Sequence, residues 1–241
     1  MLDFFLSFHP GLMALSYVIA VAGSFVALQI AGLLFRSEGK QRWQLILMGA
    51  GALGGVGIWC MHFIGMLAWR APAMATYDGL LTFASLVLVM VVVAIGLSLL
   101  TIRRNTPMIL LAGVIAGIGV AGMHYTGMAA MQVPGELVHD HTFVAISIVI
   151  AIVASAAAFW LALNTTGGAG RFGAALIMGL AVCGMHYTGM AGASVEAAQG
   201  TTITDGYLPP LVLAIMTTVM AVVFMIFSAA FFLNRWLSDI E

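Results

Sequence analysis

Three copies of one short motif hold the residues of this chain that are best suited to bind a metal ion. Each copy reads Met-His-x-x-Gly-Met, and the three histidines, His62, His124 and His186, are spaced 62 residues apart. Sulfur ligands select Cu(I), and imidazole binds both copper states. Zinc more usually recruits Cys or carboxylate, which the motifs lack. The motifs therefore predict a metal site, with copper, as Cu(I) or Cu(II), as the favoured ion.

The geometry of a helix selects the ligands within each motif. Successive helical residues are about 100° apart, so the second Met of a motif lies about 40° from the His, on the same face. The first Met lies at about 100°, at the edge of that face. The predicted ligands are His62, Met66, His124, Met128, His186 and Met190. Additional candidates are Met61, Met123 and Met185.

Small residues precede each motif on the same face. They occupy the positions seven and eleven residues before the histidines, and the glycines among them are Gly51, Gly55, Gly113, Gly117 and Gly179. Small residues let membrane helices approach closely. We therefore expect the three motif helices to meet at the centre along these stripes, where their His and Met side chains converge. The alternative is a purely structural histidine cluster, hydrogen-bonded across helices.

Residues around the predicted ligands have weaker assignments. Tyr125 and Tyr187 follow two of the histidines and are expected to flank the site, whereas the first copy has Phe63 there. His9 could lie over the cluster as a further ligand, or it could simply be a helix-start residue before Pro10.

The loops carry a second group of polar residues. Asp78, Asp140 and Asp205 each stand just before a helix and are expected to be N-caps. His139 and His141 flank Asp140. They could assist metal entry or could be solvated loop residues.

The elements that must position these residues are membrane-spanning helices. The chain has 241 residues, of which 63% are hydrophobic and 7% are charged, and its mean hydropathy is +1.12. Soluble domains are about half apolar and a quarter charged. Seven stretches are long enough to cross a bilayer, and none contains Asp, Glu, Lys or Arg in its interior. Their expected bounds are 10–35, 44–69, 80–102, 107–131, 142–163, 172–193 and 208–234.

The spacing of the motifs predicts three parallel two-helix repeats, 10–69, 80–131 and 142–193, followed by a last helix over 208–234. We expect residues 1–234 to form one seven-helix domain and residues 235–241 to form a cytoplasmic juxtamembrane stub. Seven of the eight basic residues fall on one side of the expected spans, and Arg70 falls on the other. The positive-inside rule then places the amino terminus outside, the carboxyl terminus inside and the motifs near the outer face.

Other function classes are disfavoured. The basic residues are scattered, so no nucleic-acid partner is expected. Cys60 and Cys183 lie in apolar runs and are expected to be buried thiols without a disulfide. The first apolar run lacks the basic segment of a cleavable signal peptide and is expected to be a retained helix. Lys40, in a loop, offers no amine for a retinal Schiff base. No nucleophile, base and acid come together, so we expect no catalysis within this chain.

The second and third motifs, His124-Tyr125-Thr126 and His186-Tyr187-Thr188, each preceded by Met, resemble the MHYT domain of bacterial sensory proteins. The first copy departs from the pattern at Phe63 and Ile64. The resemblance implies a copper-binding sensor of O₂, CO or NO in the bacterial inner membrane, in contact with the lipid bilayer. It also implies GGDEF or EAL domains, which turn over cyclic di-GMP, as output partners in a full-length chain. Both a monomer and a homo-oligomer are compatible with the sequence.

Two alternatives to a sensor remain. A transporter of copper or another ion would distribute its ligands across the bilayer, whereas all three motif histidines are expected in the outer half. A haem-binding redox protein would use two histidines as axial ligands, which leaves one histidine too many.

Overall fold

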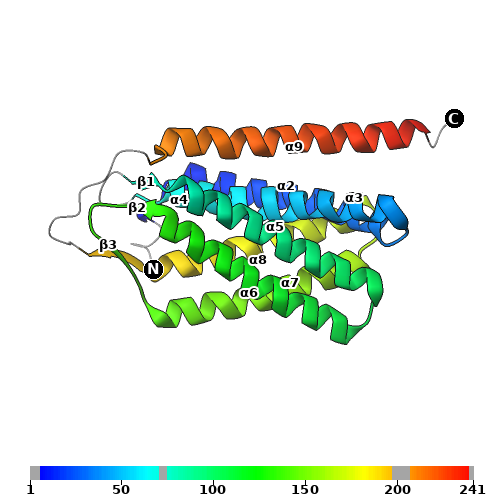
Figure 1. The fold of residues 1–241 in the computed structure, drawn as a ribbon, viewed down its shortest axis with the longest axis horizontal. Helices are drawn as coiled ribbons and strands as arrows, with labels where there is room; N and C mark the ends of the chain where they lie inside the picture. The colour runs from blue at the N-terminus through cyan, green and yellow to red at the C-terminus, as the bar shows by residue number, and fades with distance from the viewer. Residues whose placement is uncertain (1–5, 71–74, 197–206, 239–241) are drawn as a thin grey trace.

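The computed structural model describes residues 6–70, 75–196 and 207–238, and seven helical segments within them are long and apolar enough to cross a membrane (Figure 1). The seven predicted spans are therefore confirmed, each to within a few residues. The single-segment spans are α2 (Pro10–Leu34), α5 (Gly79–Ile102), α6 (Thr106–Ala130), α7 (His141–Asn164), α8 (Gly168–Ala191) and α9 (Pro210–Ser238). The second span is continuous but has three parts, α3 (Gly39–Ala50), η1 (Gly51–Cys60) and α4 (Met61–Ala68).

Side-chain caps fix the starts of three helices. Asp78 accepts a hydrogen bond from the Leu81 amide at 2.8 Å, and Asp140 accepts one from the Thr142 amide at 2.7 Å. Asn105 caps α6 in the same way. The predicted caps at Asp78 and Asp140 are confirmed, whereas Asp205 lies outside the described residues. The amide hydrogen bonds lower the pKa of the Asp140 carboxyl below its ordinary value, because they stabilise the carboxylate.

The segment η1 is a ten-residue π-helix directly before the first motif. Its hydrogen bonds run between residues five apart, so more residues fit in each turn than in an α-helix. The angles expected from α-helical spacing therefore do not hold for residues 51–60. A Cβ atom at Gly51 would meet Phe224 of α9, and one at Gly55 would meet Met220 of α9. The expected stripe of the first motif helix thus faces α9.

The glycines of the other two stripes also lie at close contacts, but the partners differ from the expectation. Cβ atoms at Gly113 and Gly117 would collide with α7, and one at Gly179 would collide with Val21 of α2. The prediction that these stripes join the three motif helices at the centre is therefore wrong. Small residues are needed where two backbones run side by side, and here the side-by-side neighbours are α7 and α2.

Short strands cover the end of the bundle that carries the motifs (Figure 1). Strand β1 (Thr76–Tyr77) pairs antiparallel with β2 (Met131–Gln132), and β3 (Glu136–His139) pairs antiparallel with β4 (Ala193–Glu196). Nothing in the sequence pattern predicts these strands, since each is only two to four residues long. They tie the loops that follow the motif helices to one another and shield the motifs from that side.

The opposite end of the bundle gathers basic residues from different connections. Arg104, after α5, donates to the Phe35 carbonyl at the end of α2. Arg171, near the start of α8, donates to Gln29 of α2. The loops after the first, third and fifth spans therefore lie at one end, as their positive charge predicts. Residues 235–238 of the predicted stub continue α9, and residues 239–241 lie outside the described part.

Candidate metal centre

The three motif histidines meet in the interior of the bundle, one from each of α4, α6 and α8. The Nδ1 atoms of His62 and His186 are 3.1 Å apart, those of His62 and His124 are 3.2 Å apart, and those of His124 and His186 are 3.3 Å apart. All three side chains are buried. Among the described residues, they form the one group of His, Cys, Asp or Glu side chains close enough to share a metal ion.

Each imidazole reaches across to a neighbouring motif helix and lies against the glycine of that motif. A Cβ atom on any of these glycines would collide with the Nε2 atom of the incoming ring. The pairs are His62 with Gly127, His124 with Gly189, and His186 with Gly65. The contacts thus run from the first copy to the second, from the second to the third and from the third back to the first, which explains the glycine of the motif.

These three glycines were not among the residues singled out from the sequence. The signal was present, because glycine recurs at the same place in all three motifs. Its angle of about 60° from the His places it off the face that carries the predicted ligands. The sequence does not show that the histidine of one helix fills the space above the motif glycine of another helix, here called the notch.

Hydrogen bonds alone leave this triangle unsatisfied. The three Nε2 atoms are buried and have no hydrogen-bond partner. A neutral imidazole has one N–H and one lone pair, on different nitrogens. If all three protons sit on Nε2, three lone pairs face one another; if all three sit on Nδ1, three N–H groups do. A mixture of tautomers lets an Nδ1–H donate to a neighbouring Nδ1 but still leaves the Nε2 atoms without partners. A protonated ring would satisfy some of these contacts, but a net charge among membrane helices is costly unless it is paired.

The dimensions of the triangle fit a metal ion. Edges of 3.1–3.3 Å place each Nδ1 about 1.8 Å from the centre, close to the usual zinc–imidazole bond of about 2.0–2.1 Å. An ion held by the three Nδ1 lone pairs would remove the repulsion between them, and the protons would then reside on Nε2. Three neutral donors without a carboxylate suit a soft or borderline ion better than a hard one.

The second methionines of the motifs, Met66, Met128 and Met190, are buried like the histidines. Their assignment as ligands stays a prediction. The first methionines are also buried but differ in their surroundings. Met61 packs with Ala20 and Cys183, and Met185 faces a cavity between the helices.

Hydrogen bonds next to the histidines link the motif helices to their neighbours α7, α2 and α5. The Tyr125 hydroxyl is 2.7 Å from the Ser147 hydroxyl of α7, and the Tyr187 hydroxyl is 2.9 Å from the Ser16 hydroxyl of α2. Each tyrosine ring also lies edge-on to the preceding histidine, with centroids 4.8 Å apart. The tyrosines thus flank the histidines and fix their helices.

The first copy has Phe63 in place of tyrosine and makes the same link by another route. Trp59, one turn earlier, donates from Nε1 to the Ser85 hydroxyl of α5 at 3.0 Å. The Trp59 and Phe63 rings are in contact, with centroids 4.9 Å apart. The departure from the motif is therefore compensated four residues away, a relation that the sequence alone does not reveal.

The other candidate residues lie farther out. His9 is exposed, and the buried residue beside it, Phe8, packs edge-on to Tyr187. His139 is partly buried and lies 5.6 Å from Tyr125 between ring centroids, and burial lowers the pKa of its imidazole. His141 is exposed.

The two cysteines are free and buried, as predicted. Cys60 donates to the Thr217 carbonyl of α9 at 3.4 Å.

Comparison with known proteins adds to this geometry. A family model described as "MHYT: Bacterial signalling protein N terminal repeat" matches residues 55–113, 117–175 and 179–239. No solved structure matches the chain.

Three relatives place the match in context. The bifunctional diguanylate cyclase/cyclic di-GMP phosphodiesterase MucR of Pseudomonas aeruginosa is 40% identical over 90% of this chain and 33% of its own length. The cyclic di-GMP phosphodiesterase NbdA of the same organism is 34% identical over 82% of this chain and 26% of its own length. The signaling protein YkoW of Bacillus subtilis is 28% identical over 80% of this chain and 25% of its own length.

The chain therefore spans a quarter to a third of the length of these relatives. The three matched segments cover most of the chain, and each begins seven residues before a motif histidine. With its seven apolar spans and its three Met-His motifs, this chain belongs to the MHYT family of bacterial signalling proteins.

Proposed function

We propose that this chain is a membrane-embedded sensor module that binds copper through its three motif histidines and responds to a diatomic gas, O₂, CO or NO, or to redox state. The observation that carries the proposal is the buried triangle of Nδ1 atoms, whose Nε2 atoms lack partners. Copper would supply a redox-active centre able to bind such a ligand. The three histidines would hold it, and Met66, Met128 and Met190 would provide sulfur.

The protein's own residues define what the centre can do. The notches at Gly65, Gly127 and Gly189 fix the orientation of the rings, and the tyrosine–serine links hold the motif helices in place. Phe8 packs on Tyr187, the strands cover the motif end and the three histidines are buried, which limits access by water. A buried, rigid set of neutral donors favours the lower charge state of a metal, because charge is costly among membrane helices.

The geometry favours a single ion over a haem. Axial histidines of a haem stand on opposite faces of the macrocycle. Here all three imidazoles meet within 3.3 Å, which leaves no space for a porphyrin between any two of them. The triangle also lies at one level near one end of the bundle, an arrangement that suits a sensor better than a transport path.

The proposed orientation places the motif end outside and the basic end in the cytoplasm, in a bacterial inner membrane. The three repeats would then be parallel around an axis through the triangle, as the cyclic histidine–glycine contacts suggest. Signals would pass to α9 through the first motif helix, because η1 and α4 contact α9. In a longer protein, α9 would pass them to cyclic di-GMP turnover domains like those named in the relatives.

Elemental analysis tests the copper site. The protein is purified in detergent, loaded with copper, washed and assayed for bound metal. We expect wild type to retain copper and the His62→Ala, His124→Ala and His186→Ala variants to lose it. The exposed His9 and His141 provide matched controls, and H9A and H141A should bind as wild type does. Equal amounts of bound copper in wild type and in the three histidine variants would refute the proposal.

The sensing step needs a separate measurement. Visible absorption and electron paramagnetic resonance spectra of the copper-loaded protein are recorded before and after addition of NO, CO or O₂. A gas-dependent spectrum in wild type, absent from H124A, is the expected result. Copper binding without any response to gas or redox state would reduce the function to metal binding alone.

A further inference from the structure

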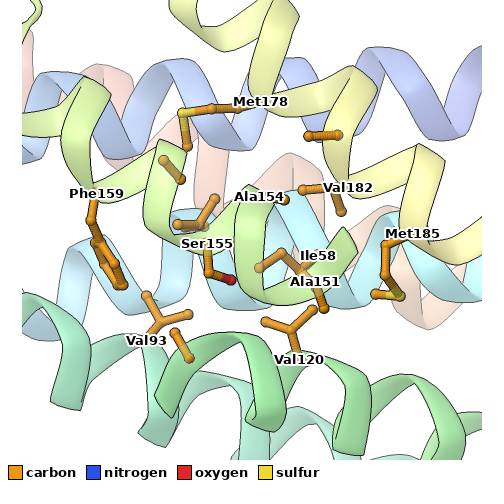
Figure 2. Close-up of a pocket in the computed structure, with 14 residues that line it drawn as sticks. Ile58, Val93, Val120, Ala151, Ala154, Ser155, Phe159, Met178, Val182 and Met185 are labelled. Carbon is orange, nitrogen blue, oxygen red and sulfur yellow. The ribbon is translucent and has the colours of Figure 1, made fainter. Parts of the chain in front are cut away.

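A second feature is a cavity between α7 and the motif helices (Figure 2). Its wall includes the residue four positions before each motif histidine, namely Ile58, Val120 and Val182. In α6 and α8 four residues make about one helical turn, or about 6 Å along the axis. The cavity therefore lies about one turn from the triangle, and all three motif helices line it.

The cavity exists because α7 presents short side chains to the motif helices. Ala151, Ala154 and Ser155 of α7 line it, and Figure 2 shows them facing Val120 and Val182. The view also shows larger side chains at its two ends, Phe159 at one and Met185 at the other. Met185 directly precedes His186, so this end of the cavity adjoins the histidine site.

The size and lining of the cavity restrict what it can hold. Its volume is about 30 Å³. By this measure one water needs about 10–15 Å³, so the cavity accepts a molecule of about two heavy atoms. Ser155 supplies the one hydroxyl group among the described lining side chains. A stable buried water needs two to four polar partners, so these walls disfavour water and suit an apolar guest.

We propose that this cavity binds a small apolar gas molecule, of the size of a diatomic, taken up from the hydrocarbon of the bilayer. Occupancy depends only on the apolar walls and needs no metal. The further step, that the cavity holds such a molecule beside the histidines and supplies their ion, rests on the proposed function. The cavity would then store the gas ligand of the sensor and would not store polar, water-soluble molecules.

Xenon is the probe, because dry apolar cavities of this kind bind it. Crystals of metal-free protein under xenon pressure are expected to show one anomalous peak among Val120, Ala154 and Val182. In detergent solution, ¹²⁹Xe chemical-shift titration of wild type should saturate. Ala154→Phe fills the cavity and should weaken xenon binding about tenfold or more. Ala157→Phe, the same change on the exposed face of α7, should leave it unchanged.

Several outcomes would overturn the inference. These are the lack of a xenon peak in the wild-type cavity, ordered water in its place, or equal titrations for A154F and A157F. The wild-type crystal decides the matter even if A154F fails to fold. With copper bound, A154F should slow the spectral response to CO or NO relative to A157F. If the wild-type protein binds xenon but retains no copper after loading with copper and washing, the cavity is supported and only the proposed function is refuted.

Discussion

The glycine of the second motif offers the sharpest test of how the histidines are held. Gly127→Ala adds a Cβ atom that would overlap His62 Nε2 and would stand 2.9 Å from His62 Cδ2 and 3.3 Å from Phe63 Cζ. The ring would have to retreat by about 1 Å, several times the tolerance of about 0.2 Å for a metal–ligand distance. Gly122→Ala is the matched control on the same helix, because its Cβ atom would meet only Leu88 Cδ2, at 3.4 Å.

The two substitutions should change stability in opposite directions. Replacing a helical glycine by alanine gains about 0.5–1 kcal/mol, so G122A should be slightly more stable than wild type. At Gly127 overpacking costs about 1–3 kcal/mol and outweighs that gain. The two variants should therefore differ by about 2 kcal/mol, or about 6 °C in the midpoint of thermal unfolding. Metal affinity should fall about 10–100-fold in G127A and stay unchanged in G122A.

Thermal unfolding in detergent measures the first difference, and copper titration against a competing chelator measures the second. The stability comparison does not depend on any metal, so it tests the packing even if copper does not bind. A G127A protein as stable as G122A, with wild-type metal affinity, would refute the role assigned to the motif glycine. Gly65→Ala and Gly189→Ala should repeat the G127A result, since the same contact recurs in all three copies.

The contacts around the site lead to three further predictions. Tyr125→Phe removes the hydrogen bond to Ser147 and should lower the free energy of unfolding by about 0.5–1.5 kcal/mol. Tyr17→Phe is the control and should lower it less, because it loses only a 3.3 Å hydrogen bond at an exposed site; equal losses in the two variants would contradict the prediction. Phe63→Tyr restores the tyrosine of the motif but adds a hydroxyl to a fully buried ring, while the neighbouring Trp59 already donates to Ser85. It should lower the unfolding midpoint by an amount equivalent to about 1–3 kcal/mol, and a stabilised variant would show that the added hydroxyl finds a partner. Hydrogen bonds hold the pKa of Asp140 below its ordinary value near 3.8, so its contribution to folding stability is present above pH 3.8 and is lost as the pH falls through the lowered pKa. Asp140→Asn should therefore reduce the loss of stability at acid pH, measured as the unfolding midpoint against pH. An unchanged pH dependence would contradict the capping role.

The sequence predicts the spans and the common level of the histidines because both depend on strong, repeated patterns. Apolar runs of about 20 residues have few alternatives to a membrane helix. Three histidines at one spacing, each at the same place in its span, must lie at one level. The shared level of His62, His124 and His186 follows from these facts alone. Their meeting does not, because the stripes expected to join their helices face α9, α7 and α2.

The packing partners could not be predicted in the same way. An angle around one helix says which residues share a face, but it does not say which helix that face meets. Gly117 therefore packs against α7 instead of a second motif helix, and Gly127 becomes the residue that receives His62. The π-helix before the first motif also escapes detection, since its glycine-rich sequence fits an α-helix equally well.

The departures of the first copy from the motif belong together. Among the three motif helices in the described part of the chain, the first has the π-helix, the Phe63 substitution and the main contacts with α9, where Cys60 donates to the Thr217 carbonyl. The second and third copies instead use tyrosine to bind α7 and α2, which belong to the ring of repeats. A displacement of His62 along its helix would therefore reach α9 directly, whereas a displacement of His124 or His186 would first have to move the first copy. The asymmetry of the three repeats thus links the symmetric triangle to α9 mainly through the first motif helix.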